Sequence, residues 1–317
     1  MKNFALIGAA GFVAERHIKA IKETGNQLVA ACDKFDVMGR MDSYFPEAEF
    51  FPDFGSFDQY IKDHQDQGTS SKIDYCSICT PNYLHHQHLE YALLNGMNAI
   101  CEKPLVIYPA EIEHLERLEK ETGFSIHGIL QLRLHPIIIA LREEYLAKPK
   151  DQIYDVDLTY ITSRGKWYYK SWKGDVSKSG GVTANIGIHF FDMLSWIFGE
   201  VKESIVNLYE PHKASGILYL ERARVRWFLS LDYDDLPESV KTKGSRTYRL
   251  VSIGGKEIEF SEGFTNLHTE IYKDIIERGG YGLQEVKPSI LLTDQIRKST
   301  PIGITDDYHP LLTHRKI

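Results

Sequence analysis

Apolar segments alternate with amphipathic ones from the start of the chain to about residue 131. Short apolar runs predict strands, and apolar residues spaced three and four apart predict helices. The predicted strands are Phe4–Gly8, Gln27–Asp33, Asp74–Thr80, Asn98–Glu102 and Ser125–Gln131. The predicted helices between them are Ala14–Thr24, Leu84–Asn95 and Pro109–Thr122. This alternation is typical of a parallel, doubly wound sheet.

The pattern changes after a predicted helix at Pro136–Ala147. Strand-like runs then follow one another: Asp155–Ser163, Ser204–Tyr209, Ile217–Tyr219, Ala223–Leu231, Thr247–Ile253 and Glu257–Phe260. Successive strands without helices between them indicate a largely antiparallel sheet. Further helices are predicted at Thr183–Phe198, Thr265–Arg278 and Leu283–Ser299. We therefore expect an α/β chain with a Rossmann domain at 1–133 and an α/β domain, built on a large, mostly antiparallel open sheet, at 134–317.

Composition narrows the function classes. A length of 317 residues favours two domains, and 43% hydrophobic residues are ordinary for a globular protein. The net charge of −7 disfavours nucleic acid and anionic membranes as partners, and no apolar run approaches the roughly 18 residues of a membrane span. Cys76 and Cys79 form a C-x-x-C, but on a strand they point to opposite faces, which suits neither a disulfide nor a metal. We expect buried, reduced thiols and a cytoplasmic setting.

The first predicted strand ends in a glycine turn. Gly8 and Gly11 are followed by a helix, and Asp33 ends the next strand about 20 residues later, as in dinucleotide-binding folds. We expect the turn from Gly8 through Gly11, Phe12 and Val13 to bind the pyrophosphate of NAD. Asp33 would accept hydrogen bonds from the ribose and repel the 2′-phosphate of NADP. A tight turn without a ligand is the alternative.

Two later strands end in polar motifs at the same sheet edge, where ligands of open α/β sheets bind. These are Thr80-Pro81-Asn82 and Glu102-Lys103-Pro104. We expect both motifs, with His85 and Gln131, to line the cofactor. Lys103 can stabilise a developing alkoxide, or could be a surface ion pair with Glu102. The histidines near residue 85 lack a carboxylate at useful spacing, so we expect no metal.

The second domain offers a base and a cationic segment. Asn185 and His189 stand one turn apart on an otherwise apolar helix, and a histidine suits general-base work on a hydroxyl; a packed core histidine is the alternative. Residues 163–178 mix basic and aromatic side chains, including Arg164 and Lys173. In an acidic chain this segment favours an anionic ligand with a ring, such as a nucleotide-sugar, over single-stranded nucleic acid or a solvated loop.

Together these motifs resemble the Gfo/Idh/MocA oxidoreductases over essentially the whole chain. The resemblance rests on the glycine turn, Cys79-Thr80-Pro81-Asn82, Glu102-Lys103-Pro104 and the run from Gly180-Gly181 through Asn185 and His189 to Asp192. Segments such as LTYITSRGKWYYKSWKGD and EFSEGFTNLH are similar to the bacterial UDP-N-acetylglucosaminuronate 3-dehydrogenases of O-antigen assembly.

The resemblance implies NAD-dependent oxidation of the sugar C3 hydroxyl, which prepares a ketone for a partner aminotransferase. It also implies a homotetramer and tightly held NAD that 2-oxoglutarate regenerates. Lys103, Asn185 and His189 would be catalytic, with Arg164 and Lys173 on the uronate or diphosphate. Much of the family carries aspartate where this chain has Asn185, so the base role would fall on His189. An NAD-dependent glycosidase and a non-catalytic NAD sensor are the rival functions.

Overall fold

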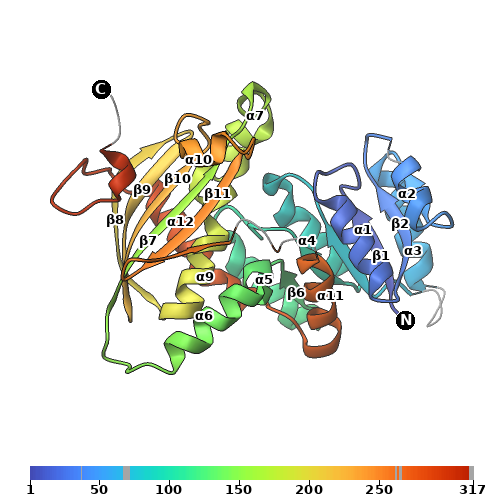
Figure 1. Cartoon of the computed structure of the whole chain (residues 1–317). Helices are drawn as coiled ribbons and strands as arrows, with labels where there is room; N and C mark the ends of the chain where they lie inside the picture. The colour runs from blue at the N-terminus through green and yellow to red at the C-terminus, as the bar shows by residue number, and fades with distance from the viewer. Residues whose placement is uncertain (37, 67–71, 261–262, 264–265, 314–317) are drawn as a thin grey trace. The chain divides into compact units, whose positions relative to one another are not determined.

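The computed structural model describes residues 1–36, 38–66, 72–260, 263 and 266–313. Contacts divide the chain into two units (Figure 1), the first formed by Met1–Gln131 with Thr265–Lys287 and the second by Leu132–Phe264 with Pro288–Ile317. The chain first passes from the first unit to the second after Gln131, within two residues of the predicted boundary at 133. The later return of the chain to the first unit is absent from that prediction.

The first unit is built on a six-stranded parallel sheet in the order β3-β2-β1-β4-β5-β6. Its strands are β1 (Asn3–Ile7), β2 (Gln27–Cys32), β3 (Glu49–Phe51), β4 (Tyr75–Ile78), β5 (Asn98–Cys101) and β6 (Ile126–Gly128). The predicted parallel sheet is confirmed. Strand order reverses between β1 and β4, and open α/β sheets bind ligands beyond the carboxyl ends of such strands.

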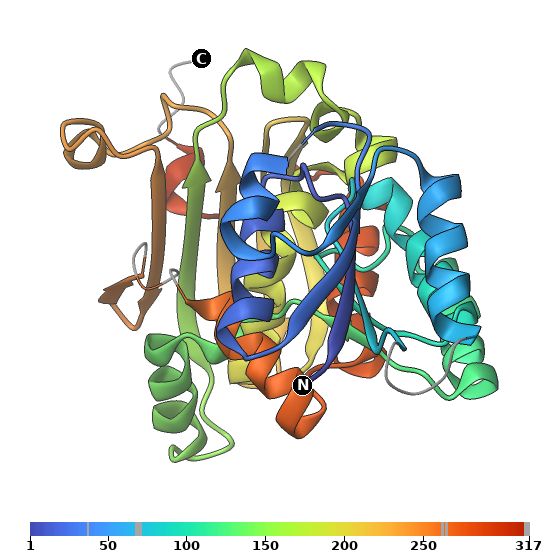
Figure 2. The same cartoon turned by 90° about the vertical axis from the view of Figure 1, so that its right-hand side faces the viewer.

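Helices cover both faces of this sheet (Figure 2). They are α1 (Ala14–Glu23), α2 (Met38–Tyr44), α3 (Phe54–Asp66), α4 (His85–Leu94), α5 (Ala110–Thr122) and α11 (Leu267–Arg278). The hydrophobic pattern did not single out α2, β3 or α3. In α3 only Phe57 and Ile61 are buried, so the apolar face of this helix is too small to give a clear helical pattern in the sequence.

Helix α11 belongs to the first unit because it packs on α1 and reaches the interior of that unit. The Tyr272 side chain is fully buried, and its hydroxyl bonds His17 Nδ1 at 2.7 Å and Ser77 Oγ at 2.6 Å. Thr269 Oγ1 donates to Glu23 Oε2 at 2.6 Å. These long-range polar contacts explain why the chain returns.

The second unit is built on a six-stranded mixed sheet in the order β12-β11-β7-β10-β9-β8. Its strands are β7 (Tyr154–Thr162), β8 (Val201–Glu210), β9 (Lys213–Leu220), β10 (Ala223–Ser230), β11 (Thr247–Ile253) and β12 (Lys256–Glu259). β7 and β10 pair in parallel, and the other neighbours pair antiparallel. The predicted, largely antiparallel sheet is confirmed.

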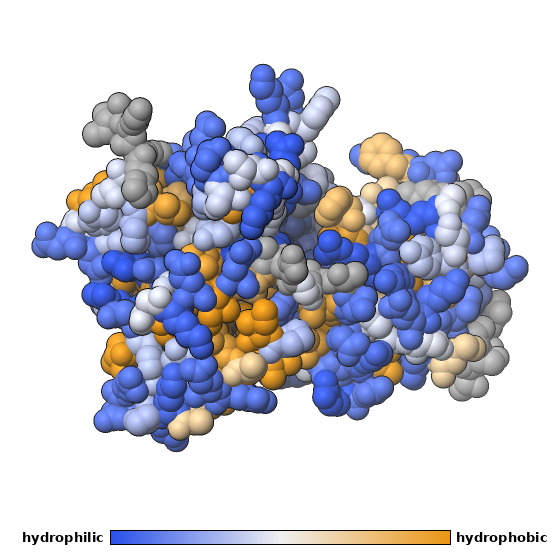
Figure 3. Space-filling model, viewed as in Figure 1, coloured by the Kyte–Doolittle hydropathy of each residue, from blue (hydrophilic) through white to orange (hydrophobic). Residues whose placement is uncertain are grey.

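Alternate side chains of this sheet build the core of the second unit. Trp227 and Leu229 of β10 pack with residues of α6 (Pro136–Leu146), α9 (Ile188–Phe198) and α12 (Leu283–Lys298). Part of this apolar interior shows at the surface beside α9, in a face that is otherwise largely hydrophilic (Figure 3). The C-terminal segment packs Leu312 against Ile161 and Phe228 in a separate cluster.

The four cysteines are buried free thiols, as expected from their place on strands. Burial raises the pKa of both Cys76 and Cys79, so these thiols stay protonated. Among the described residues, no helix combines the length and the apolar character that crossing a bilayer requires.

Two buried histidines predict loss of stability in mild acid. Burial lowers the pKa of His88 to about 4 and that of His309 to about 3. The unfolded chain binds protons near pH 6.5 and the folded chain does not, so stability falls as the pH drops below 6.5. By pH 5 each histidine is expected to cost about 2 kcal/mol. Urea unfolding at pH 7.5 and pH 5.0 measures this loss.

His309→Gln serves as the control for the acid effect. Its ring accepts from Leu311 N through Nδ1 and meets Thr159 Oγ1 at 3.1 Å, which suits the neutral tautomer. The variant should lose the share of the pH dependence that His309 contributes. Equal stability of the unmodified protein at the two pH values would contradict the assignment of neutral, buried imidazoles.

Candidate functional site

The glycine turn of the first unit is held against the end of β4. A Cβ atom at Gly8, whose φ is +90°, would lie 2.7 Å from the backbone of Thr80, and one at Gly11 would lie 2.7 Å from Cys79 O. Both glycines are therefore required by close backbone approach as well as by the turn. Phe12 follows with 82% of its surface exposed, and α1 begins after Val13. This backbone fits a dinucleotide pyrophosphate at a helix N-terminus.

Asp33 and Arg40 both contact the turn. Asp33 accepts from Ala10 N at 2.9 Å through Oδ2 and from Phe35 N at 3.0 Å through Oδ1. Arg40 donates from Nη1 to the carbonyl oxygens of Ala9, at 3.2 Å, and Gly11, at 3.4 Å. Sequence reasoning missed Arg40, because it lies on the unpredicted helix α2 and nothing local marks it as a partner of the turn.

His85 ties together the two motifs that follow β4 and β5. Its side chain is fully buried, with Nδ1 2.7 Å from Pro104 O and Nε2 2.8 Å from Thr80 O. Both ring nitrogens thus lie near backbone carbonyls. Burial lowers the pKa of His85, and a neutral ring donates from one nitrogen only, so His85 hydrogen-bonds one of the two loops and packs against the other. His88 supports the same place through Thr80 Oγ1 at 3.0 Å. Pro81 is partly buried and Asn82 is buried beside them.

Glu102 lies at the centre of a buried polar network. Its Oε1 is 3.1 Å from His17 Nε2 and 3.0 Å from His268 Nε2. Burial raises the pKa of Glu102, but the hydrogen bonds from His17 and His268 outweigh it and hold that pKa well below its ordinary value. The three ligand atoms lie within 4.8 Å and could hold a metal ion, although hydrogen bonds already account for these contacts. Lys103, partly buried, follows directly and precedes Pro104 across a cis peptide bond.

The candidate catalytic helix of the second unit begins in an unusual form. Residues Thr183–Gly187 form a π-helix, and α9 continues from Ile188, where a single α-helix was predicted. Single π-turns inside α-helices are frequently found at functional sites. Asn185 lies in the π-turn and is 8% exposed, while His189 in the first turn of α9 is partly buried. Asp192 is held by Arg133 through contacts of 2.6 and 3.0 Å.

The basic and aromatic segment lies just beyond the end of β7, where it forms α7 (Lys166–Lys170). Asn185 Nδ2 donates to Tyr168 Oη at 2.5 Å, so this segment contacts the π-turn. Arg164 is exposed, and Lys173 is partly buried. Burial lowers the pKa of Lys173, and the positive charge of Arg164 lowers it further. An anion bound here would relieve that repulsion.

The structure thus brings the predicted residues together in two groups. The first unit joins the glycine turn, Asp33, the Thr80 and Glu102 motifs and His85 at the carboxyl edge of its sheet; Gln131 is the last residue of its first segment. The second unit joins Asn185 with the segment that carries Arg164 and Lys173.

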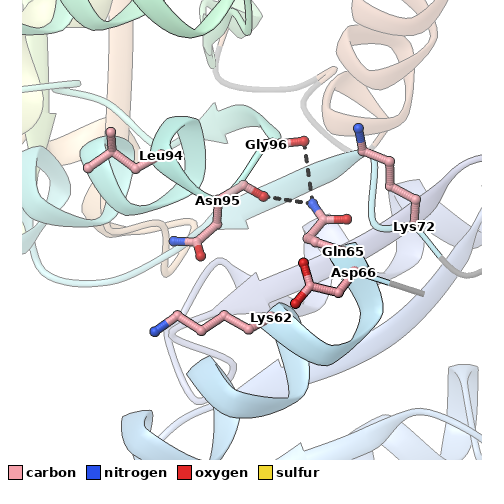
Figure 4. A pocket seen from close by; sticks show the side chains of 7 residues that line it. All are labelled: Lys62, Gln65, Asp66, Lys72, Leu94, Asn95 and Gly96. Carbon is pink, nitrogen blue, oxygen red and sulfur yellow. Dashed lines mark hydrogen bonds between the residues drawn. The ribbon is translucent and has the colours of Figure 1, made fainter. Parts of the chain in front are cut away.

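A pocket of about 350 Å³ lies elsewhere in the first unit (Figure 4). Its walls include Gln65, which donates to Asn95 O at 2.7 Å, and Gly96. Gly96 and Lys72 precede β5 and β4, so the pocket lies at the amino ends of these strands. The predicted cofactor residues stand at the carboxyl ends, where sheets of this kind bind ligands.

Known proteins match both units. The profile of the NAD-binding Rossmann fold of the Gfo/Idh/MocA oxidoreductase family matches residues 2–127, and that of its C-terminal alpha/beta domain matches residues 151–233. The WlbA (WbpB) dehydrogenase of Thermus thermophilus, solved with NAD and UDP-GlcNAcA, is 46% identical with a TM-score of 0.93, over 98% of this chain and 99% of that one. A second structure of that enzyme holds NAD and alpha-ketoglutarate, with 47% identity and the same TM-score and coverage.

More distant relatives match over part of their length. D-glucoside 3-dehydrogenase of Escherichia coli is 26% identical over 215 residues, which are 66% of this chain and 57% of that protein. Inositol 2-dehydrogenase of Rhizobium meliloti is 25% identical over 64% of this chain and 57% of its own. The chain thus spans little more than half of these curated relatives.

Proposed function

Because this chain belongs to the Gfo/Idh/MocA oxidoreductase family, we propose that it oxidises the C3 hydroxyl of UDP-N-acetylglucosaminuronic acid to a ketone with NAD. The observation that carries this proposal is the 46% identity, over 98% of the chain, to a dehydrogenase solved with NAD and UDP-GlcNAcA. The glycine turn and Glu102-Lys103-Pro104 supply the groups that such a reaction needs. A glycosidase or a sensor has no comparable support.

The first unit holds the cofactor in this proposal. Gly8, Gly11, Phe12 and Val13 bind the pyrophosphate, and Asp33 binds the adenosine ribose. The remaining cofactor contacts come from Thr80, Pro81, Asn82, Glu102, Lys103, Pro104 and Gln131. His85 acts by packing between two of these loops, with its ring nitrogens beside Thr80 O and Pro104 O. NAD⁺, when bound, accepts the hydride that leaves C3.

In the proposed reaction, side chains of this protein remove the proton of the C3 hydroxyl and stabilise the negative charge on its oxygen. His189 removes the proton of the C3 hydroxyl as the hydride departs, which leaves a carbonyl at C3. Lys103 stabilises the negative charge that develops on that oxygen. Asn185 orients the hydroxyl, since an amide cannot take its proton. Arg164 and Lys173 bind the anionic groups of the nucleotide-sugar.

The proposed setting combines a second complex of the same relative with what the sequence resemblance implies. NAD stays bound and 2-oxoglutarate reoxidises it, in line with the alpha-ketoglutarate complex of the Thermus enzyme. A ketone is the group that an aminotransferase converts to an amine, so the 3-keto sugar suits a partner aminotransferase in O-antigen biosynthesis of lipopolysaccharide. We place this cycle in the cytoplasm and in a homotetramer.

Incubation of the purified protein with UDP-GlcNAcA tests the proposal. We expect NADH absorbance at 340 nm without added NAD⁺ (about one turnover per bound cofactor) and a nucleotide-sugar lighter by two hydrogens. Addition of 2-oxoglutarate should remove the absorbance and allow further turnover. Release of a free sugar without a lighter product would favour the glycosidase, and an unchanged substrate would leave only a sensor.

A further inference from the structure

Tyr168, which the proposed mechanism does not use, is the hydrogen-bond partner of Asn185. The Asn185 amide donates to Tyr168 Oη at 2.5 Å. A hydroxyl oxygen that accepts this bond keeps its own proton for a different acceptor. The two residues come from α7 and the π-turn, so the phenol links the basic segment to the candidate catalytic helix.

The phenol of Tyr168 is neutral and fixed. Burial raises its pKa, and the Asn185 bond and the charge of Arg164 only partly oppose that rise. The ring packs against the core of the second unit and meets Tyr169 edge to face, with centroids 5.5 Å apart. At neutral pH the group is therefore a positioned hydrogen-bond donor and not a base.

One cation acts on this donor, and a second cation follows in the same segment. The charge of Arg164 acts on both Tyr168 and Lys173. An O–H donor in the field of the Arg164 cation suits a carboxylate, because hydrogen bonds to an ionised acceptor are about twice as strong as neutral ones. The sugar of UDP-GlcNAcA carries such a carboxylate. In UDP-GlcNAc a hydroxymethyl group replaces it, which attracts no cation.

We propose that Tyr168 selects a uronate over a neutral sugar by donating its phenol proton to the hexuronate carboxylate. Arg164 and Lys173 supply the charge around that carboxylate, and Asn185 holds the phenol oxygen in place. This inference rests on the proposed function and adds the group that distinguishes its substrate from the neutral sugar UDP-GlcNAc.

Tyr168→Phe tests the proposal, because it removes only the hydroxyl. Tyr169→Phe is the matched control, since Tyr169 is the next residue of α7 and is 42% exposed. Calorimetric titrations measure Kd for three ligands: UDP-GlcNAcA, UDP-GlcNAc and NADH. The two UDP-sugars are titrated into protein already loaded with NADH. Tyr168→Phe should raise Kd for UDP-GlcNAcA about 10- to 100-fold, the scale of a hydrogen bond to a charged group. The Kd values of Tyr168→Phe for UDP-GlcNAc and NADH should stay within about twofold of those of the unmodified protein. In Tyr169→Phe, the Kd values for all three ligands should stay within that range.

Different outcomes separate this inference from the function beneath it. An unmodified protein that fails to bind UDP-GlcNAcA overturns the proposed function. An unmodified protein that binds, together with a Tyr168→Phe variant that binds equally well or loses both sugars alike, overturns only the role of Tyr168. If Tyr168→Phe does not fold, Arg164→Gln at an exposed position replaces it and should weaken UDP-GlcNAcA alone. Equal weakening of both sugars by Arg164→Gln would likewise contradict a carboxylate subsite.

Discussion

Replacement of His189 by alanine is expected to lower the rate of NADH formation in a single turnover by about 10² to 10⁴, the range for loss of a general base. The reason is that the proposed reaction would lose the group that is assigned to take the proton of the C3 hydroxyl. Asn185 cannot take its place because an amide does not accept a proton near neutral pH. Stopped-flow absorbance at 340 nm with saturating UDP-GlcNAcA measures the effect.

His212→Ala is the control for His189→Ala. His212 lies between β8 and β9 and faces Glu210 and Asp232 at 3.4 Å, in a partly exposed ion-pair cluster. Its loss should leave the single-turnover rate unchanged. A folded His189→Ala protein with a near-normal rate would contradict the base assignment and return His189 to the role of a core residue.

Lys103→Ala is expected to lower the same rate by about 10² to 10³, the scale for one preorganised donor to a developing oxyanion. The NAD affinity should change less, because the pyrophosphate and adenosine are assigned to the glycine turn and Asp33. The double variant with His189→Ala should fall short of the product of the two losses, since the proposed mechanism assigns both groups to the same reaction step. Lys62→Ala, on the exposed side of α3, is the control.

A structural role for Lys103 predicts the opposite pattern. Loss of an ion pair would lower the melting temperature and leave the rate per folded molecule intact. Glu102 already accepts hydrogen bonds from His17 and His268, at 3.1 and 3.0 Å. Thermal melts run beside the single-turnover experiment therefore separate a catalytic ammonium from a stabilising one.

The motifs of the first unit could be predicted because each consists of residues that are close together in the sequence. Gly8 and Gly11 mark a strand-to-helix turn, and Pro81 and Pro104 each stand three residues after a strand end. The alternation of strands and helices then gave the parallel sheet. Contacts between residues far apart in the sequence could not be predicted. Glu102 is 85 residues from His17 and 166 from His268, and no local sequence pattern indicates such partners.

The second unit shows a different limit. Apolar periodicity predicted a helix over Thr183–Phe198, but it could not show that the first residues form a π-turn. Tyr168 was one aromatic residue among four in its segment. Only the fold brings its hydroxyl to Asn185. Side-chain partners across a turn depend on tertiary packing, which a hydrophobic pattern does not encode.

The return of α11 to the first unit has a consequence for synthesis. Domains generally fold as units while the chain emerges from the ribosome, N-terminal ones first. Here the first unit lacks Thr265–Lys287 until most of the chain has been made. Until then Glu102 is without His268, and His17 is without the Tyr272 hydroxyl. We therefore expect the first unit to complete its fold only after α11 has been translated, more than a hundred residues later. Until then the Glu102 carboxylate lacks part of its hydrogen-bond network.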